Sequence, residues 1–227
     1  MADRKIALVF DVNETLLDLR ELDAPFEQVF GDAAVRMQWF QQLLQNALVS
    51  TVTDAYADFG AIGRAALQMV AARRGRELSE DDTSRILGTI RRLPPHPEVR
   101  EALERLRAEG FRLATLTNST EAVAQAQLEN AGLASLFERI LSADSVQRLK
   151  PGPEPYHMAA RELGVEAGQL CLVAAHAWDV AGALRAGCRA AFVARPGMVL
   201  DPLAPEPDVV GSDLAEIAER LVELPKT

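Results

Sequence analysis

The sequence predicts an α/β fold, a doubly wound parallel sheet with a helical cap inserted after the first strand. Three observations predict it. Apolar segments rich in β-branched residues alternate with helical patterns, a long helical stretch interrupts that alternation once, and polar residues follow one apolar segment after another. Parallel strands need crossover connections, so the alternation indicates a sheet that helices cover on both faces.

The predicted strands are short and apolar. They are Ile6–Phe10, Leu113–Leu116, Ile140–Ser142, Leu170–Ala174 and Ala190–Ala194, with a weaker sixth at Val209–Val210. The helices predicted between the later strands are Pro97–Glu109, Glu121–Ala131, Pro155–Leu163 and Val180–Ala186. A glycine ends each of these helices, because glycine adopts the left-handed conformation of a helix C-cap at little cost. These glycines are Gly110, Gly132, Gly164 and Gly187.

The helical stretch begins soon after the first strand. About a hundred residues separate Asp11 from Leu113, which is too many for a single crossover. Helices are predicted there at Ala33–Leu48, Thr53–Arg74 and Ser79–Leu93, and the stretch ends at the stiff "LPPHP" segment. We therefore expect a core domain of residues 1–16 and 96–227 and a helical cap domain of residues 17–95. A cap that leaves the first strand at its carboxyl end would roof the ligand crevice and exclude water.

Composition limits the classes of function. Hydrophobic residues make up 48% and charged residues 25% of the 227 residues, as in ordinary soluble proteins. The net charge of −9 argues against nucleic-acid binding, and no apolar stretch approaches the ~20 residues of a membrane helix. The N-terminus lacks the apolar segment of a signal peptide, and two cysteines, Cys171 and Cys188, are too few for a disulfide framework or a zinc site. These features predict a cytoplasmic protein without nucleic-acid or membrane partners.

Polar residues gather at the carboxyl ends of the predicted strands. Asp11 follows the first strand, Thr117 and Asn118 the second, Lys150 the third, and His176 and Asp179 the fourth. The carboxyl ends of parallel strands meet at one edge of a sheet, so we expect these side chains to form one site. A turn-forming aspartate after a strand is common by itself, but the whole series in this order is a specific signal.

This series resembles the haloacid dehalogenase superfamily, and within it the 2-haloacid dehalogenases with a helical cap. The four motifs of that superfamily appear as Asp11 to Thr15, Thr117–Asn118, Lys150–Pro151 and Asp179, and the resemblance covers nearly the whole chain. The segments "SADSVQRLKPGPEPY" and "HAWDVAGA" are more similar to the dehalogenase branch than to the phosphatase branch.

The resemblance implies a hydrolase that uses no metal or cofactor. Asp11 would displace halide from a small 2-haloacid, and water would then split the aspartyl ester to give a 2-hydroxy acid. Lys150 would keep Asp11 ionised, Thr15 would orient it, and Asp179 with His176 would position the water. The substrate-binding residues implied are Val12, Asn13, Phe40, Thr117, Asn118, Tyr156 and Trp178.

Asn13 separates the two branches. The phosphatases carry a second aspartate two residues after the nucleophile to protonate the leaving alcohol, and an amide cannot donate a proton in this way. They also bind magnesium through clustered carboxylates. Asp11 and Asp179 alone would make a poor magnesium site, whereas a halide needs no protonation to leave.

The chain departs from the dehalogenase pattern at four positions. Asn13 stands where an aromatic residue is expected, and Phe40 stands in place of a cap arginine that receives the halide, for which Arg36 is the nearby substitute. Ala174 and His176 replace a serine and an asparagine that assist the water. His176 either acts in the hydrolytic step or fills the place of the asparagine as a hydrogen-bonding spacer.

Two other functions stay open on these residues. One is a magnesium-dependent phosphatase of small phosphate esters, and the other is a non-catalytic relative that binds small carboxylates. Thr15, Asn118 and Thr120 are also candidate helix caps. The loop "RPGMVLDPLAPEPD" (residues 195–208) is a candidate contact in a homodimer.

Overall fold

The structure is a computed structural model and describes residues 6–223. Within that range six parallel strands form one sheet in the order β3-β2-β1-β4-β5-β6. Strand β1 therefore lies at the centre, where the strand order reverses, and its carboxyl end lies at the point where open α/β sheets bind ligands. The predicted doubly wound parallel sheet is confirmed. The strands are β1 (Ala7–Phe10), β2 (Arg112–Thr117), β3 (Arg139–Ser142), β4 (Leu170–Ala174), β5 (Arg189–Val193) and β6 (Val209–Gly211).

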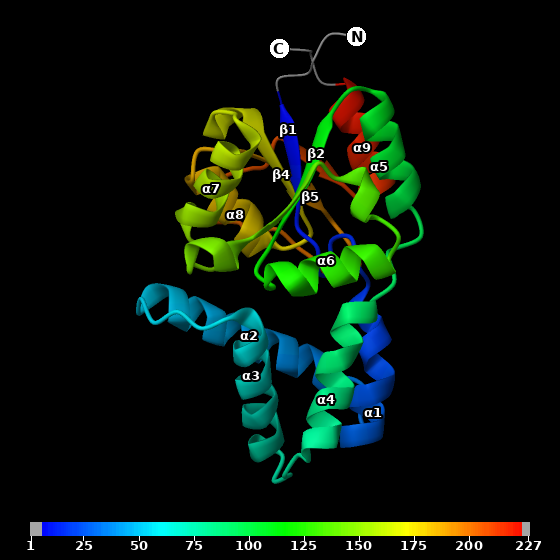
Figure 1. Ribbon diagram of the computed structural model, residues 1–227, viewed down its shortest axis with the longest axis vertical. Coiled ribbons are helices and arrows are strands. Elements are labelled where there is room, and N and C mark those ends of the chain that lie inside the picture. The colour runs from blue at the N-terminus through cyan, green and yellow to red at the C-terminus, as the bar shows by residue number, and fades with distance from the viewer. Residues whose placement is uncertain (1–5, 224–227) are drawn as a thin grey trace.

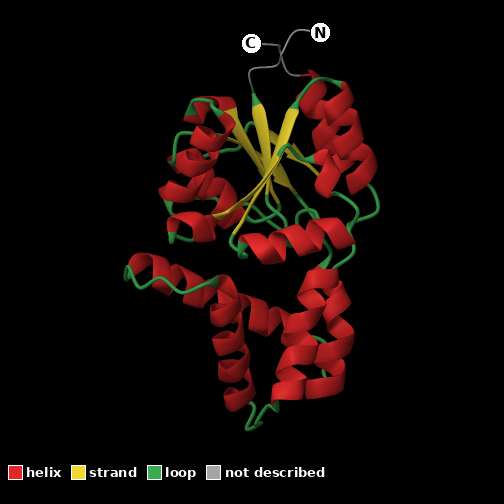
Figure 2. Cartoon of the chain, viewed as in Figure 1, coloured by secondary structure: helices red, strands yellow, loops and turns green. Residues whose placement is uncertain are grey.

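Helices cover both faces of this sheet (Figures 1 and 2). On one face lie α5 (Val99–Ala108) and α9 (Leu214–Glu223), and on the other lie α7 (Pro153–Leu163) and α8 (Ala177–Arg185). Strand β1 shows why both faces are apolar, since side chains of a strand alternate between the faces. Leu8 and Phe10 belong to the cluster that contains the α5 and α9 side chains, whereas Ala7 and Val9 belong to the cluster of α7 and α8.

A separate layer of helices lies over the carboxyl ends of the strands (Figure 1). We call it the α1–α4 layer; it consists of α1 (Asp23–Phe30), α2 (Val35–Val52), α3 (Phe59–Arg73) and α4 (Glu80–Thr89). Helix α6 (Glu121–Asn130) runs between this layer and the sheet. The buried Trp39 of α2 donates its Nε1–H to the carbonyl of Gly63 in α3 at 2.9 Å and so fixes these two helices together. Apolar packing continues from the sheet into the layer, because Phe10 and Trp39 belong to one buried cluster.

Short 3₁₀ segments complete the described chain. They are η1 (Leu19–Leu22), η2 (Ile90–Arg92), η3 (Ala134–Leu136), η4 (Ala143–Val146) and η5 (Ala167–Gln169). The four predicted glycine stops all have positive φ, and Gly164 is the left-handed C-cap of α7 with φ 64°.

One predicted helix begins at a different residue, and two helices of the structure were not predicted. The helix predicted at Thr53–Arg74 begins only at Phe59, because the Asp58 carboxylate caps it by accepting from the backbone N–H of Ala61 at 2.9 Å. Helix α1 was not predicted, since it is only eight residues long and has no side-chain cap. Helix α9 was not predicted either, although its buried Leu214, Ile217, Ala218 and Leu221 follow helical spacing.

Among residues 6–223, no helix has both the length and the apolar character needed to cross a membrane. Cys171 and Cys188 are both buried and both carry free thiols.

Candidate active site

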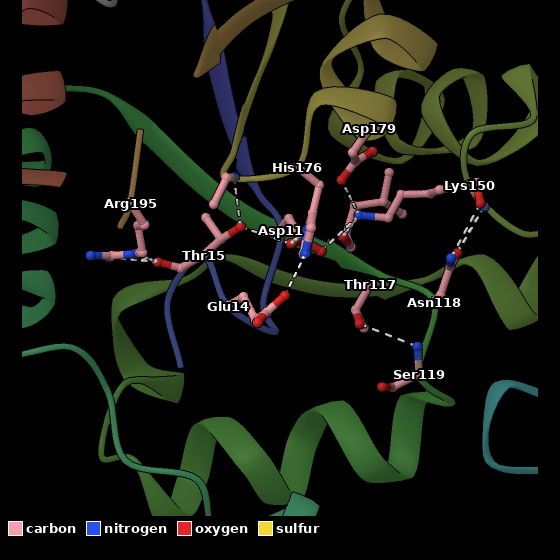
Figure 3. Close-up of polar contacts among 12 residues, drawn as sticks. Asp11, Glu14, Thr15, Thr117, Asn118, Ser119, Lys150, His176, Asp179 and Arg195 are labelled. Carbon is pink, nitrogen blue, oxygen red and sulfur yellow. Dashed lines mark hydrogen bonds and ion pairs between the residues drawn. The ribbon is translucent and has the colours of Figure 1, made fainter. Parts of the chain in front are cut away.

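Two carboxylates and one ammonium meet at the carboxyl end of β1 (Figure 3). The Nζ atom of Lys150 lies 2.9 Å from Oδ1 of Asp11 and 2.6 Å from Oδ2 of Asp179, and it also donates to the carbonyl of Leu116 at 2.9 Å. An ammonium has three N–H groups, so each of them has an acceptor. The three charged side chains are almost wholly buried: the exposed fraction is 1% for Lys150, 7% for Asp11 and 0% for Asp179. The predicted meeting of Asp11, Lys150 and Asp179 is therefore observed.

The electrostatics of this cluster place a negative charge on Asp11. Burial by itself raises the pKa of Asp11, but the Lys150 ammonium and the neighbouring His176 outweigh it and hold that pKa well below its ordinary value. Burial lowers the pKa of Lys150, and the two carboxylates more than reverse this and raise it. Burial, reinforced by the charge of Asp11, raises the pKa of Asp179 despite the contact with Lys150. The result is an ionised Asp11 in a buried site.

The second oxygen of Asp11 is held by Thr15. The Thr15 hydroxyl donates to Oδ2 of Asp11 at 2.8 Å and accepts from the backbone N–H of Ala175 at 3.0 Å, so its donor direction is fixed. The backbone N–H of Asp11 donates to the carbonyl of Val173 at 3.0 Å. Thr15 therefore orients the carboxylate and does not cap a helix; Asp18 caps the segment that follows.

His176 lies on the other side of Asp11. Its Nδ1 is 3.3 Å from Oδ2 of Asp11, and its Nε2 is 2.9 Å from Oε2 of Glu14 (Figure 3). Its ring stacks on Trp178, with centroids 5.3 Å apart, and lies 5.9 Å from the ring of Phe40. Burial lowers the pKa of His176, but the hydrogen bonds and charges of Asp11 and Glu14 raise it to about 9. At neutral pH His176 is therefore an imidazolium.

Asn118 fixes the backbone around Lys150. Its Oδ1 accepts from the Lys150 N–H at 2.8 Å, and its Nδ2 donates to the Lys150 carbonyl at 3.3 Å. Thr117 accepts from the backbone N–H of Ser119 at 3.2 Å, which shapes the turn before α6. Asn118 is not the cap of α6, and Thr120 occupies the N-cap position without a side-chain hydrogen bond.

The remaining predicted residues lie at different depths. Oδ1 of Asn13 accepts from Nε2 of Gln127 at 2.9 Å, and the buried Val12 accepts two backbone N–H groups that close the turn after β1. Tyr156 lies behind Asp179, where its hydroxyl donates to Oδ1 at 2.6 Å. It is fully buried, so in this structure it supports Asp179 from the rear of the site.

Two cavities adjoin this cluster. A cavity of about 620 Å³ lies between the α1–α4 layer and the core. Asn13 and Ser119 line it from the core, and apolar side chains line it from the layer, among them Trp39, Phe40, Leu43, Phe59 and Leu87. A groove of about 490 Å³ lies on the far side of Phe40 and is lined by Glu14, Arg36, His176 and Trp178 among others. Phe40 lines both the cavity and the groove.

The oxygens of the two carboxylates are already engaged by donors. Lys150 and Tyr156 bind the oxygens of Asp179, while Lys150, Thr15 and His176 bind those of Asp11. Across residues 6–223, no group of three His, Cys, Asp or Glu side chains is arranged to hold a metal ion. A cation at Asp11 would have to displace these donors.

Several residues of the site were not predicted. Glu14 contacts His176, Ser119 lines the cavity and Gln127 holds Asn13. Glu14 lies within the Asp11 to Thr15 motif but was given no role, and Ser119 and Gln127 lie outside the four motifs. Arg36, the suggested substitute for the cap arginine, does reach the groove. Its Nη1 lies 3.9 Å from Oε1 of Glu14, and its Nε lies 2.5 Å from Oδ1 of Asp23. The only signal for Glu14 was its place three residues after Asp11.

The chain is similar to known dehalogenases over nearly its whole length. The chain is 31% identical to (S)-2-haloacid dehalogenase 2 of Pseudomonas sp. (strain CBS-3), over 94% of each chain. It is 30% identical to haloacetate dehalogenase H-2 of Moraxella sp. (strain B), over 89% of this chain and 91% of that one.

The similarity extends to solved structures and to a family profile. The L-2-haloacid dehalogenase of Xanthobacter autotrophicus, solved with chloropropionic acid covalently bound, matches with a TM-score of 0.90 at 25% identity, covering 96% of this chain and 99% of that one. The profile of haloacid dehalogenase-like hydrolases matches residues 7–187. Since this match spans most of the chain and the whole series of strand-end residues, the protein belongs to the haloacid dehalogenase-like hydrolases, as its motifs predicted.

Proposed function

We propose that this protein is a 2-haloacid dehalogenase that acts without a metal ion. The Asp11 carboxylate displaces halide from C2 of a small (S)-2-haloacid with inversion, and water then splits the aspartyl ester to release an (R)-2-hydroxy acid. One observation carries the proposal: a buried Asp11 is kept ionised by Lys150 at 2.9 Å, and the residue two places on is Asn13, which cannot act as an acid. The dehalogenase relatives support it.

In this proposal each residue around Asp11 has a separate role. Thr15 orients the carboxylate, and Lys150, supported by Asp179, keeps it charged. The substrate carboxylate binds at the turn formed by residues 117–119 and at the backbone after Asp11, while its alkyl group lies in the apolar cavity. Residues 17–95 act as the cap domain that closes this cavity, and residues 1–16 and 96–227 form the core domain.

Because Phe40 stands in place of the cap arginine, other groups must stabilise the negative charge of the departing halide. The indole Nε1–H of Trp178 is buried and has no hydrogen-bond partner among the described residues, and the adjacent His176 is a cation. The His176 ring lies 5.9 Å from the Phe40 ring, and Trp178 lines the same groove as Phe40. We propose that they take the role of the missing arginine, because a desolvated donor or cation stabilises a developing anion strongly.

The test is halide release from (S)-2-chloropropionate and (S)-2-bromopropionate in the presence of a chelator. We expect release of halide and formation of (R)-lactate, with Asp11→Asn inactive. In ¹⁸O-labelled water, a single turnover should put the label into Asp11 and not into lactate, because water attacks the carboxyl carbon of the ester. Label in lactate during the first turnover would exclude Asp11 as the nucleophile.

The magnesium-dependent phosphatase is the competing activity for the same assay panel. Hydrolysis of small phosphate esters only when magnesium is added, with no halide release, would favour it. Binding of small carboxylates without any covalent adduct on Asp11 would favour the non-catalytic relative.

We also propose that the protein is a cytoplasmic homodimer. Exposed apolar side chains on α2, among them Met37, Val49 and Val52, together with Val199 and Leu203 of the 195–208 loop, are the surfaces that support self-association. The two free buried thiols suit a reducing compartment. Sedimentation equilibrium should give twice the chain mass, and Val52→Glu with Val49→Glu should shift it to the monomer.

A further inference from the structure

Glu14 adopts a backbone conformation that is costly for its residue type. Its φ is 62°, in the left-handed region where residues other than glycine are uncommon. The conformation is held at both ends: the Glu14 N–H donates to the carbonyl of Leu17 at 2.8 Å, and the Glu14 carbonyl lies 3.3 Å from Nε2 of His96. The side chain that this turn projects ends 2.9 Å from Nε2 of His176. A strained backbone thus aims a carboxylate at a ring beside the nucleophile.

The contact determines which nitrogen of His176 carries a proton. An ionised carboxylate only accepts hydrogen bonds, so Nε2 must be an N–H group facing Glu14. Nδ1 faces Oδ2 of Asp11, which also only accepts while it is ionised. Once Asp11 is an ester it has no charge, and the ring releases its Nδ1 proton to water in the groove as the halide departs. His176 then becomes neutral with Nδ1 as a free acceptor next to Cγ of Asp11.

Asp179 is less suited to take a proton from water. Its two oxygens are occupied by Lys150 at 2.6 Å and Tyr156 at 2.6 Å, and its side chain is fully buried. Glu14 and His176, in contrast, both line the groove of about 490 Å³, so water can reach the ring from that side. Among residues 6–223, His176 is the one side chain that is hydrogen-bonded to Asp11 and also lines the groove.

We propose that His176 is the general base for hydrolysis of the Asp11 ester, and that Glu14 is the residue that positions it and fixes its tautomer. The proposal rests on the proposed function, because it assigns a role within the second half-reaction. It adds Glu14 to the machinery and gives His176 a proton-transfer role in place of the spacer role that its sequence position left open.

The proton and bond changes balance in this scheme. Water attacks Cγ of the ester and gives a proton to Nδ1 of His176, so that a C–O bond forms and a tetrahedral intermediate results. The bond from Cγ to the substrate oxygen then breaks, and the leaving alkoxide takes the proton from Nδ1 as the 2-hydroxy acid departs. Asp11 is left as a carboxylic acid, and its proton returns to His176. The resting pair of carboxylate and imidazolium is restored.

The charges around His176 suit this cycle. Asp11 from the end of β1 and Glu14 from the turn after it face the two ring nitrogens directly. Behind them, Arg36 of α2 lies 3.9 Å from Glu14, and Lys150 lies 2.9 Å from Asp11, so each carboxylate has a cation nearby. Arg36 also pairs with Asp23, and Lys150 also pairs with Asp179. The contact between Glu14 and Nε2 of His176 does not involve Asp11, so it can hold the orientation of the ring during hydrolysis.

The test separates the two half-reactions in Glu14→Gln, Glu14→Gly and His176→Gln. All three should still release about one equivalent of halide per chain and then accumulate the Asp11 ester, seen as an added mass on the intact protein. In the two Glu14 variants this release should be a rapid burst, and in His176→Gln it should be slower, because the departing halide loses a neighbouring cation. Steady-state turnover should fall by about 10²- to 10⁴-fold in His176→Gln. It should fall by at least about tenfold in Glu14→Gly and less in Glu14→Gln, which can still accept the Nε2–H hydrogen bond.

Two matched controls isolate the contact. Asp18→Asn removes a carboxylate that lines the same groove with similar side-chain exposure, 18% against 17% for Glu14, but that pairs with Arg20. Gln147→Gly relieves a left-handed residue, φ 49°, in an exposed turn elsewhere. Both should turn over as the wild type does.

A second readout does not depend on turnover. In ¹⁵N-histidine NMR titrations, the pKa of His176 should fall in Glu14→Gln and stay unchanged in Asp18→Asn. Unchanged ester hydrolysis in Glu14→Gly, or an unchanged His176 pKa in Glu14→Gln, would overturn the proposal while leaving the dehalogenase function in place. Absence of halide release from the wild type would overturn both.

Discussion

Lys150 is the residue on which the buried charges of the site depend. Its ammonium is the shared partner of Asp11 and Asp179, and all three side chains lie in the interior. Breaking a buried ion pair by removing one partner leaves an uncompensated charge, which costs far more than loss of an exposed pair. The pair of carboxylates is therefore tolerated only because the ammonium lies between them.

Lys150→Met should destabilise the fold by about 3–5 kcal/mol at pH 7. In the wild type the pKa of Asp11 is lowered from its ordinary value of 3.8, so ionised Asp11 stabilises the fold when the pH is above 3.8. This contribution is progressively lost as the pH falls below 3.8. In the variant a carboxylate takes up a proton, so the deficit should shrink from pH 7 to pH 5. Urea unfolding at both values measures this, and an equal deficit at both would contradict it.

Because of His176, the free energy of unfolding of the wild type should decrease as the pH rises into the alkaline range. Its pKa is raised from 6.5 to about 9 by Asp11 and Glu14, against the effect of burial. Its contribution is therefore fully present below pH 6.5 and is lost as the pH rises through about 9, and it amounts to roughly 3 kcal/mol. Urea unfolding between pH 6 and 10 should show this decrease. The decrease should largely disappear in His176→Gln.

Among the secondary-structure elements, α8 is packed unusually closely against the Lys150 loop. An added Cβ on Gly182 of α8 would lie 2.6 Å from Cβ of Pro151 and 2.6 Å from the hydroxyl of Tyr156. Tyr156 and Asp179 are themselves hydrogen-bonded, so this contact helps to set the position of the whole charged cluster. Only glycine allows the helix to approach so closely.

Gly182→Ala should therefore destabilise the protein by about 1–3 kcal/mol and slow halide release, because Pro151 and Lys150 must shift together. Gly88→Ala in α4 is the matched control, since within the described residues its added Cβ meets no atom closer than 4 Å. That control should keep or gain stability, by up to about 1 kcal/mol, because alanine favours helix over glycine. Equal unfolding free energies for the two variants would contradict the packing argument.

For the molecule as a whole, the α1–α4 layer is joined to the core beside the active site. Tyr56, between α2 and α3, donates to Asp144 of η4, and Arg148 lies 2.5 Å from Asp54. Thr51 at the end of α2 donates to the carbonyl of Leu149 at 3.5 Å. These contacts connect the layer to the segment that leads into Lys150, so they link closure of the cavity to the charged cluster.

Tyr56→Phe should loosen this closure. We expect the KM for a haloacid to rise severalfold with a smaller change in kcat, because the chemical groups are untouched. The free energy of unfolding should change by no more than about 1 kcal/mol, since the partners are partly exposed. Arg220→Ala, which removes an exposed ion pair with Glu216 on α9, is the control and should leave KM unchanged. A wild-type KM in Tyr56→Phe would show that these contacts do not hold the layer closed.

Much of this protein was predictable from the order of its residues. Alternating apolar and helical segments with glycine stops predicted the parallel sheet, because these signals are local and repeat at every crossover. The series Asp11, Thr117–Asn118, Lys150 and Asp179 predicted a shared site, because the carboxyl ends of parallel strands must meet. The amide at Asn13 indicated chemistry without a nearby acid, since that property belongs to the residue itself.

The tertiary structure decided what depends on distant neighbours. It placed Tyr156 behind Asp179, brought Gln127 to Asn13, and turned Glu14 toward His176, which lies 162 residues further along the chain. It also moved the start of α3 to Phe59 and added α1 and α9. Such contacts follow from strand order, register and a strained turn, none of which the spacing of residues reveals. The sequence alone therefore determined the kind of chemistry, and the three-dimensional arrangement determined which groups can carry the proton.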